Sequence, residues 1–67
     1  MNQKEAQQLE LRIQREAPQY RTSLEYVTFY GGTGWGVKLV QKDSGNPIGV
    51  MEGEEEWDEL KLDLGVG

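Results

Sequence analysis

The sequence contains no cysteine and no histidine among its 67 residues. Disulfide bonds are therefore excluded, and so is a zinc site of the usual nitrogen and sulfur type. The commonest general base and the thiol nucleophile are missing as well, so we expect a protein that is not an enzyme. A chain without cysteine fits a reducing compartment, and we expect it to be cytoplasmic.

Long apolar runs are absent too. No stretch approaches the roughly 18 residues that a membrane span requires, and residues 1–5 lead into a polar helix, with no hydrophobic signal region. We therefore expect a soluble protein that makes no membrane contact. A chain of this length has room for one core, and such domains are marginally stable unless good packing or self-association reinforces them. The sequence predicts a single domain over residues 1–67, with a homodimer as one option.

The net charge of −5 is unevenly distributed along the chain. Residues 1–21 and residues 22–42 each sum to +1, whereas residues 43–67 carry eight acids against Lys61 alone and sum to −7. A negative field of this kind repels phosphate backbones, so we do not expect nucleic acid as a partner. An acidic surface instead suits solubility or a basic protein partner.

The first segment has the pattern of a helix. Asn2 can act as its N-cap, and Glu5 stands three residues later, as a capping box requires. Apolar residues recur at helical spacing and form one narrow stripe, made of Ala6, Leu9, Ile13 and Ala17. Pro18 disfavours helical geometry at Ala17, so we expect the helix to end near Glu16.

The middle of the chain is rich in β-branched and aromatic residues, which favour strands. One strand is expected from Thr22 to Tyr30, followed by a flexible turn at residues 31–34. A second strand is expected over residues 35–41 and a third, opened by Pro47, over residues 48–52. Pro47 and nearby glycines place the third strand at a sheet edge. The short turns predict an antiparallel meander with the second strand in the centre.

The last segment, residues 54–64, fits two patterns. Trp57, Leu60 and Leu64 share one helical face, but Leu60, Leu62 and Leu64 alternate as in a strand. We favour a helix, because three glutamates would occupy its first turn, where negative charge complements the helix dipole. Gly65 could then be the left-handed residue of a Schellman ending.

These elements predict an α+β fold in α-β-β-β-α order, with a three-stranded antiparallel meander packed with two helices. The helices should cover one sheet face, to which the first strand contributes one of two apolar sets: Val27 with Phe29, or Leu24 with Tyr26 and Tyr30. Two helices on one side would leave the other set in water, as at many interaction sites. One helix on each side would cover both sets.

Two clusters resemble ligand sites only superficially. The glycine-rich run at residues 31–36 leads into a strand, whereas phosphate-binding loops lead into a helix, so we interpret it as a hairpin turn. The acidic face formed by Glu54, Glu55 and Glu56 lacks the alternating loop of a calcium site. We therefore expect no metal, no cofactor and no catalytic residue, and we interpret the acidic face as solvated charge or as a contact for a basic partner.

Aromatic residues are the best candidates for a protein-binding site, because Trp and Tyr are favoured at binding hot spots. The candidate residues are Leu24, Tyr26, Tyr30, Trp35 and Trp57. Both tryptophans have a simpler interpretation as core residues, since large aromatics supply much of the buried area of a small domain. Base stacking by the tyrosines would also need a basic groove, and few basic residues lie near them.

The sequence supports two hypotheses for function. The first is a small non-enzymatic adaptor, regulator or assembly subunit, which binds another protein or itself through an exposed sheet face or the free edge of the first strand. The second is an acidic decoy that presents carboxylates in place of phosphates to a nucleic-acid-binding protein. A decoy needs its carboxylates spread along one outer face, which the fold can test. The composition argues against a third class, a small enzyme or metal binder.

Overall fold

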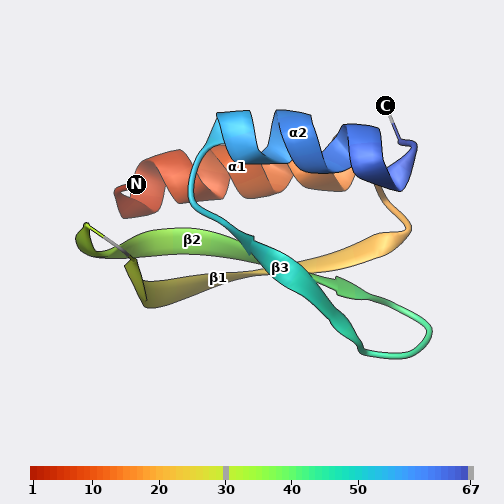
Figure 1. Ribbon diagram of the computed structural model, residues 1–67, viewed down its shortest axis with the longest axis horizontal. Coiled ribbons are helices and arrows are strands. Elements are labelled where there is room, and N and C mark those ends of the chain that lie inside the picture. The colour runs from red at the N-terminus through yellow and green to blue at the C-terminus, as the bar shows by residue number, and fades with distance from the viewer. Residues whose placement is uncertain (30, 67) are drawn as a thin grey trace.

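Five elements follow one another in the computed structural model, which describes residues 1–29 and 31–66 (Figure 1). They are α1 (Gln3–Glu16), β1 (Tyr20–Phe29), β2 (Gly32–Gln41), β3 (Pro47–Met51) and α2 (Glu54–Leu64). The strands form one antiparallel sheet in the order β1-β2-β3. This arrangement confirms the predicted α+β fold, its α-β-β-β-α order and the central position of the second strand.

Both helices lie on the same face of the sheet (Figure 1). α1 packs over β1 and β2, and α2 lies beside α1 and packs against β3. The alternative of one helix on each face is therefore wrong. We call the sheet face that points away from the helices the open face, and no described helix or strand covers it.

α1 begins and ends where the sequence predicts. The side chain of Asn2 accepts a hydrogen bond from the N–H of Glu5 at 2.8 Å, and the Glu5 carboxylate accepts one from the N–H of Asn2 at 3.1 Å. This reciprocal capping box satisfies two of the free N–H groups at the helix start. At the other end, Ala17 leaves the helical conformation directly before Pro18, as the steric demand of proline requires.

α2 is a helix rather than a strand. Gly65 adopts the left-handed conformation with φ of 73°, and its N–H points back to the carbonyl of Leu62. The N–H of Val66 donates to the carbonyl of Lys61 at 3.0 Å. These two bonds form the Schellman ending that the sequence predicts.

The hairpin between β1 and β2 is tighter than predicted. Gly32, Thr33 and Gly34 belong to β2, where they lie opposite Phe29, Thr28 and Val27. The prediction of a flexible turn over residues 31–34 was therefore wrong for these three residues. Glycine is a poor strand signal, but Gly32 and Gly34 continue the ladder that the following residues of β2 form with β1. β3 is also shifted by one residue, and the register slips between Leu39 and Val40.

The core lies between the helices and the inner face of the sheet. Its buried members come from both helices, the loop after α1 and two strands: Ala6, Leu9, Ile13, Ala17, Val37, Leu39, Met51 and Trp57. The predicted core residues Leu60 and Leu64 lie half-buried at its margin. Of the two apolar sets of β1, Leu24 and Tyr26 lie on the helix-covered face, because Leu24 lies opposite the buried Val37. The third member of this set, Tyr30, lies outside the described residues.

Candidate protein-binding surface

The outer edge of β1 carries backbone groups that bond no other strand. In an antiparallel pair, successive residues direct their backbone groups alternately toward and away from the neighbouring strand. Tyr26 lies opposite Trp35, whose N–H donates to the carbonyl of Met1 at 3.0 Å instead of to β1. Tyr26 therefore directs its N–H and C=O away from β2, toward solvent.

The same alternation applies along the whole strand. The N–H of Tyr20 points outward and donates to the carbonyl of Ala17 at 3.1 Å. By parity, the backbone groups of Thr22, Leu24 and Thr28 point outward as well. Among the described residues, no backbone bond outside the strand ladder reaches them. We call this row of outward groups the β1 edge.

Three of the five residues predicted to bind a partner cluster at one end of the helix-covered face. The rings of Tyr26 and Trp35 meet edge to face, with centroids 5.5 Å apart and planes at 73°. The Tyr26 hydroxyl lies 3.2 Å from the Thr33 hydroxyl. Tyr26 is 62% exposed, whereas Leu24 and Trp35 are half-buried against the core. Tyr26 is thus the member of this group that a partner could reach most fully.

The other two predicted residues do not join this group. Trp57 is 0% exposed and fills the centre of the core, which favours its interpretation as a packing residue. Its indole N–H donates to Glu16 Oε1 at 3.2 Å. Tyr30 lies outside the described residues.

The open face combines half-buried valines with a cross-strand charge pair. Val27, Val40 and Val50 lie on this face by strand alternation and register. A Cβ atom added to Gly36 would lie 2.7 Å from Val50 Cγ1 and 3.7 Å from Val27 Cγ2, so these two valines close over the glycine. Val27 and Val50 therefore partly shield one another on this face.

Two charged residues of β1 stand on the open face. The Glu25 carboxylate lies 3.7 Å from Lys38 Nζ on β2, in a loose and exposed ion pair. Arg21 is exposed and makes no ion pair in the part of the chain that the structure describes. The exposed pair of Glu25 with Lys38 contributes about 0–1 kcal/mol to stability. Arg21 and Glu25 therefore remain available to a partner that pairs with the β1 edge.

The acidic residues are divided between an internal network and the outer side of α2. Arg12 donates from Nε to Glu16 at 2.7 Å and from Nη2 to Asp58 at 2.6 Å. Lys61 Nζ donates to Glu16 Oε1 at 3.2 Å. The hydrogen bond from Arg12 is the main cause that lowers the pKa of Glu16 to about 2 and also lowers the pKa of Asp58.

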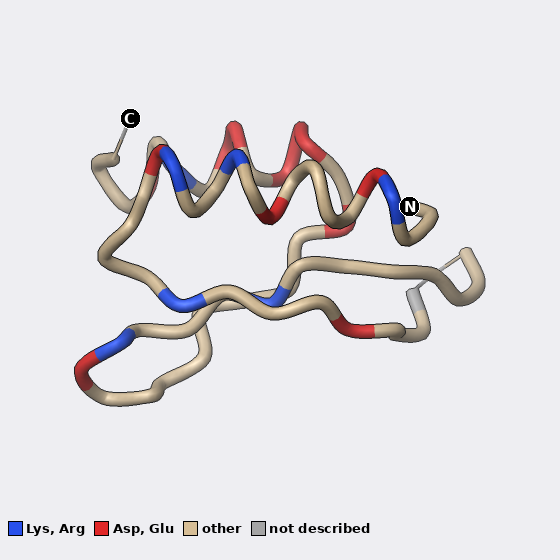
Figure 2. Tube along the Cα trace, turned by 180° about the vertical axis from the view of Figure 1, so that it is seen from behind, with Lys and Arg blue, Asp and Glu red and all other residues tan. Residues whose placement is uncertain are grey.

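The predicted acidic face is therefore not a uniform surface. Arg12 Nη1 reaches Glu54 at 3.4 Å, so this carboxylate turns toward α1. Glu56 accepts a hydrogen bond from the N–H of Glu52 at 3.3 Å. Glu55 and Glu59 are exposed and make no ion pair with another described residue. Figure 2 shows that most acids gather on α2 and the loop before it, away from β1.

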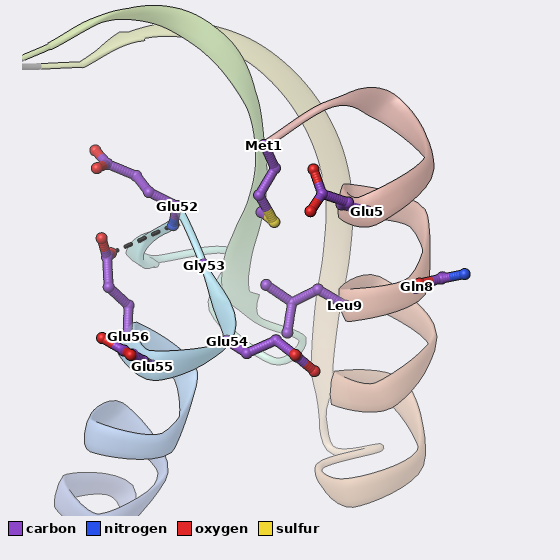
Figure 3. Close-up of a pocket in the computed structure, with 9 residues that line it drawn as sticks. All are labelled: Met1, Glu5, Gln8, Leu9, Glu52, Gly53, Glu54, Glu55 and Glu56. Atoms are coloured by element: carbon purple, nitrogen blue, oxygen red, sulfur yellow. Dashed lines mark hydrogen bonds between the residues drawn. The ribbon is translucent and has the colours of Figure 1, made fainter.

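An open groove of about 510 Å³ lies between the N-terminal parts of the two helices (Figure 3). Met1 and Leu9 supply apolar surface, and five carboxylates stand around it: Glu5, Glu52, Glu54, Glu55 and Glu56. Within residues 1–29 and 31–66, no group of acidic side chains converges closely enough to hold a metal ion. The groove can repel anions and attract cations, but it contains no converging set of ligands.

A smaller hollow of about 320 Å³ lies beside the first residues of β1. It is lined by Gln14, Pro18, Tyr20, Arg21, Thr22 and Lys42. Gln14 Nε2 donates to the Thr22 hydroxyl at 2.9 Å and so forms one wall of the hollow between α1 and β1. We call it the β1 hollow. The sequence did not predict this hollow, because nothing in the sequence indicates that Gln14 of α1 contacts Thr22 of β1.

Comparison of the chain with known protein families, with curated proteins and with solved structures gives no match. No helix in the described part of the chain is long and apolar enough to cross a membrane. The β1 edge is therefore the candidate binding site. The exposed Tyr26 side chain lies on its helix-covered side, and the β1 hollow lies beside its first residues.

Proposed function

We propose that this protein acts by binding another protein chain along the β1 edge, as an adaptor, regulator or assembly subunit, and not by catalysis. An exposed edge strand recognises an extended segment through main-chain hydrogen bonds, and side chains beside the edge select the partner. The observation that carries the proposal is the row of outward backbone groups at Thr22, Leu24, Tyr26 and Thr28.

The two edges of the sheet differ in a way that supports this choice. β3 has five residues and begins with Pro47, which cannot donate to a new strand. β1 has ten residues, no proline and no register slip against β2. Natural proteins commonly shorten, kink or cover an edge of this length to prevent unwanted pairing. An edge left long and regular is therefore well suited to pair with a partner strand.

A site-specific photocrosslinking experiment tests the proposal. A benzophenone amino acid is placed at Ser23, which is exposed on β1, and in a second variant at Glu59, which is exposed on α2. Irradiation in cells, followed by mass spectrometry, should give a discrete adduct from position 23, either with another protein or with a second copy of the chain. If position 23 gives no discrete adduct, the proposed function is wrong.

The acidic decoy remains a second candidate, supported by the exposed carboxylates of Glu55 and Glu59 on the outer side of α2. A decoy would bind a basic surface through this side of the molecule. The crosslinker at Glu59 then gives the adduct, with a nucleic-acid-binding protein, and Glu55→Lys together with Glu59→Lys abolishes the binding. A partner on the β1 edge would tolerate both substitutions.

A further inference from the structure

We infer that the partner on the β1 edge is a second copy of the chain, paired antiparallel about Ser23 so that two three-stranded sheets join into one. The inference rests on the proposed function, since it names the occupant of the same edge. A two-fold axis perpendicular to the sheet would relate the copies, which is the symmetry of most homodimers. Both pairs of helices would then lie on the same side of the joined sheet.

The outward groups restrict the possible registers. Hydrogen bonds across the new junction require that Thr22, Leu24 and Tyr26 of one copy lie opposite even-numbered residues of the other. A shift by one residue would place outward groups against inward ones and would exchange the two faces of the sheet. In each allowed register, one residue of β1 lies opposite the same residue of the second copy, and we call this residue the centre.

Charge complementarity selects one of these registers. A centre at Ser23 places Arg21 opposite Glu25 of the second copy, and by symmetry places Glu25 opposite the second copy's Arg21. A centre at Leu24 would place Arg21 opposite Val27, and a centre at Glu25 would oppose two glutamates. Opposite charges directly across an antiparallel pair are stabilising, and like charges are destabilising. The segment from Tyr20 to Tyr26 is thus complementary to itself.

Shape supports the same register on the helix-covered side. With Ser23 at the centre, Tyr26 of the second copy lies opposite Tyr20, which lines the β1 hollow. Tyr26 is 62% exposed, more than Tyr20, Trp35 or Trp57. An exposed ring and a hollow related by the same two-fold axis fit an interface in which one patch binds itself. Aromatic pairs across strands add to the stability of such a junction.

The overall charge distribution is compatible with this pairing. β1 carries one base and one acid, Arg21 and Glu25, whereas most of the acids lie on α2, which packs against β3, and on the loop before it (Figure 2). Joining two chains at β1 therefore keeps their acidic parts apart. Self-association is also one of the few means by which a chain this small, without disulfides, can enlarge its buried surface.

Sedimentation velocity over a concentration series, from micromolar to millimolar, tests the inference. The wild-type chain should shift from the mass of one chain to the mass of two. Arg21→Glu should weaken dimerisation by about tenfold or more, because two opposed pairs change from attraction to repulsion. The double variant Arg21→Glu/Glu25→Arg should recover it, since the charges are exchanged but remain complementary. Circular dichroism checks that each variant is folded.

Two proline variants form a matched control for the position of the junction. Thr22→Pro and Thr28→Pro each remove an outward N–H, but only Thr22 lies inside the paired segment. Thr22→Pro should therefore weaken dimerisation by about tenfold or more, whereas Thr28→Pro should leave it near wild type. Equal effects of the two prolines would overturn the inference.

The remaining outcomes separate this inference from the proposed function. A wild-type chain that stays monomeric at millimolar concentration, or a double charge variant that does not recover, overturns the register about Ser23. If a different protein is then crosslinked at position 23, the proposed function stands without a second copy. If no protein is crosslinked there, both proposals fail together.

Discussion

Glu16 Oε1 accepts a hydrogen bond from the indole N–H of Trp57 at 3.2 Å, although the two residues stand 41 positions apart in the chain. The bond joins the last turn of α1 to the first turn of α2, beside the fully buried Trp57 ring. Arg12 and Lys61 donate to the same carboxylate. Glu16 therefore connects the two helices that cover the sheet.

Glu16→Gln should lower the free energy of unfolding by about 1–3 kcal/mol, because the half-buried carboxylate that pairs with Arg12 and Lys61 loses its charge. Glutamine keeps an oxygen that can accept from Trp57, but it leaves the charges of Arg12 and Lys61 uncompensated. Urea denaturation at pH 7, followed by tryptophan fluorescence, measures the change. Glu59→Gln, at an exposed position without an ion pair among the described residues, is the control and should stay within about 0.5 kcal/mol of wild type.

The pH dependence of stability should follow the same carboxylate. The pKa of Glu16 falls from its ordinary value of 4.5 to about 2 on folding, mainly through the hydrogen bond from Arg12. A lowered pKa in the folded state means that its stabilising effect is complete above pH 4.5 and is lost as the pH falls through about 2. Asp58, whose pKa is also lowered by Arg12, acts in the same direction.

Thermal melting between pH 7 and pH 2 measures this effect. The melting temperature of the wild type should fall across the acid range, and the fall should be smaller in Glu16→Gln, because a glutamine cannot be protonated there. The remaining fall reflects Asp58 and the other acids. Equal slopes in the two proteins would contradict the assignment to Glu16.

Gly36→Ala should destabilise the sheet by about 1–3 kcal/mol through overpacking. The added Cβ would lie 2.7 Å from Val50 Cγ1 and 3.1 Å from the carbonyl oxygen of Met51, and the backbone atom cannot easily move. Gly49→Ala is the matched control on the neighbouring strand, because its Cβ would meet only Met51 Cε, at an ordinary 3.5 Å. Urea denaturation of both variants should separate them, and equal losses would show that Gly36 is not a packing contact.

The sequence was sufficient to predict the order and type of all five elements, because their signals are local. The capping box of Asn2 and Glu5, the stop at Pro18 and the Schellman glycine at position 65 each depend on residues a few positions apart. The packing of both helices on one face was left open, since apolar residues occur on both sides of the first strand.

The candidate site was harder to predict, because it depends on parity and register. Periodicity alone could not show that Tyr26 directs its backbone groups outward, a fact that follows from the bond between Trp35 and Met1. The contacts of Glu16 with Trp57 and Lys61 could not be predicted either, because all three strands lie between these residues in the sequence. Trp57 was weighed as a surface residue and as a core residue, and its burial favours the core.

Asn2→Ala should destabilise the protein by about 1 kcal/mol, within a range of about 0.5–2, because the N-cap side chain satisfies the N–H of Glu5. Asn2→Asp is the control and should stay near wild type, since aspartate caps a helix equally well. The cap also holds the chain start where the carbonyl of Met1 meets the N–H of Trp35 on β2. Hydrogen exchange at the Trp35 amide should therefore speed up in Asn2→Ala more than exchange in the middle of β2. An unchanged Trp35 amide together with wild-type stability would show that the cap does not support this contact.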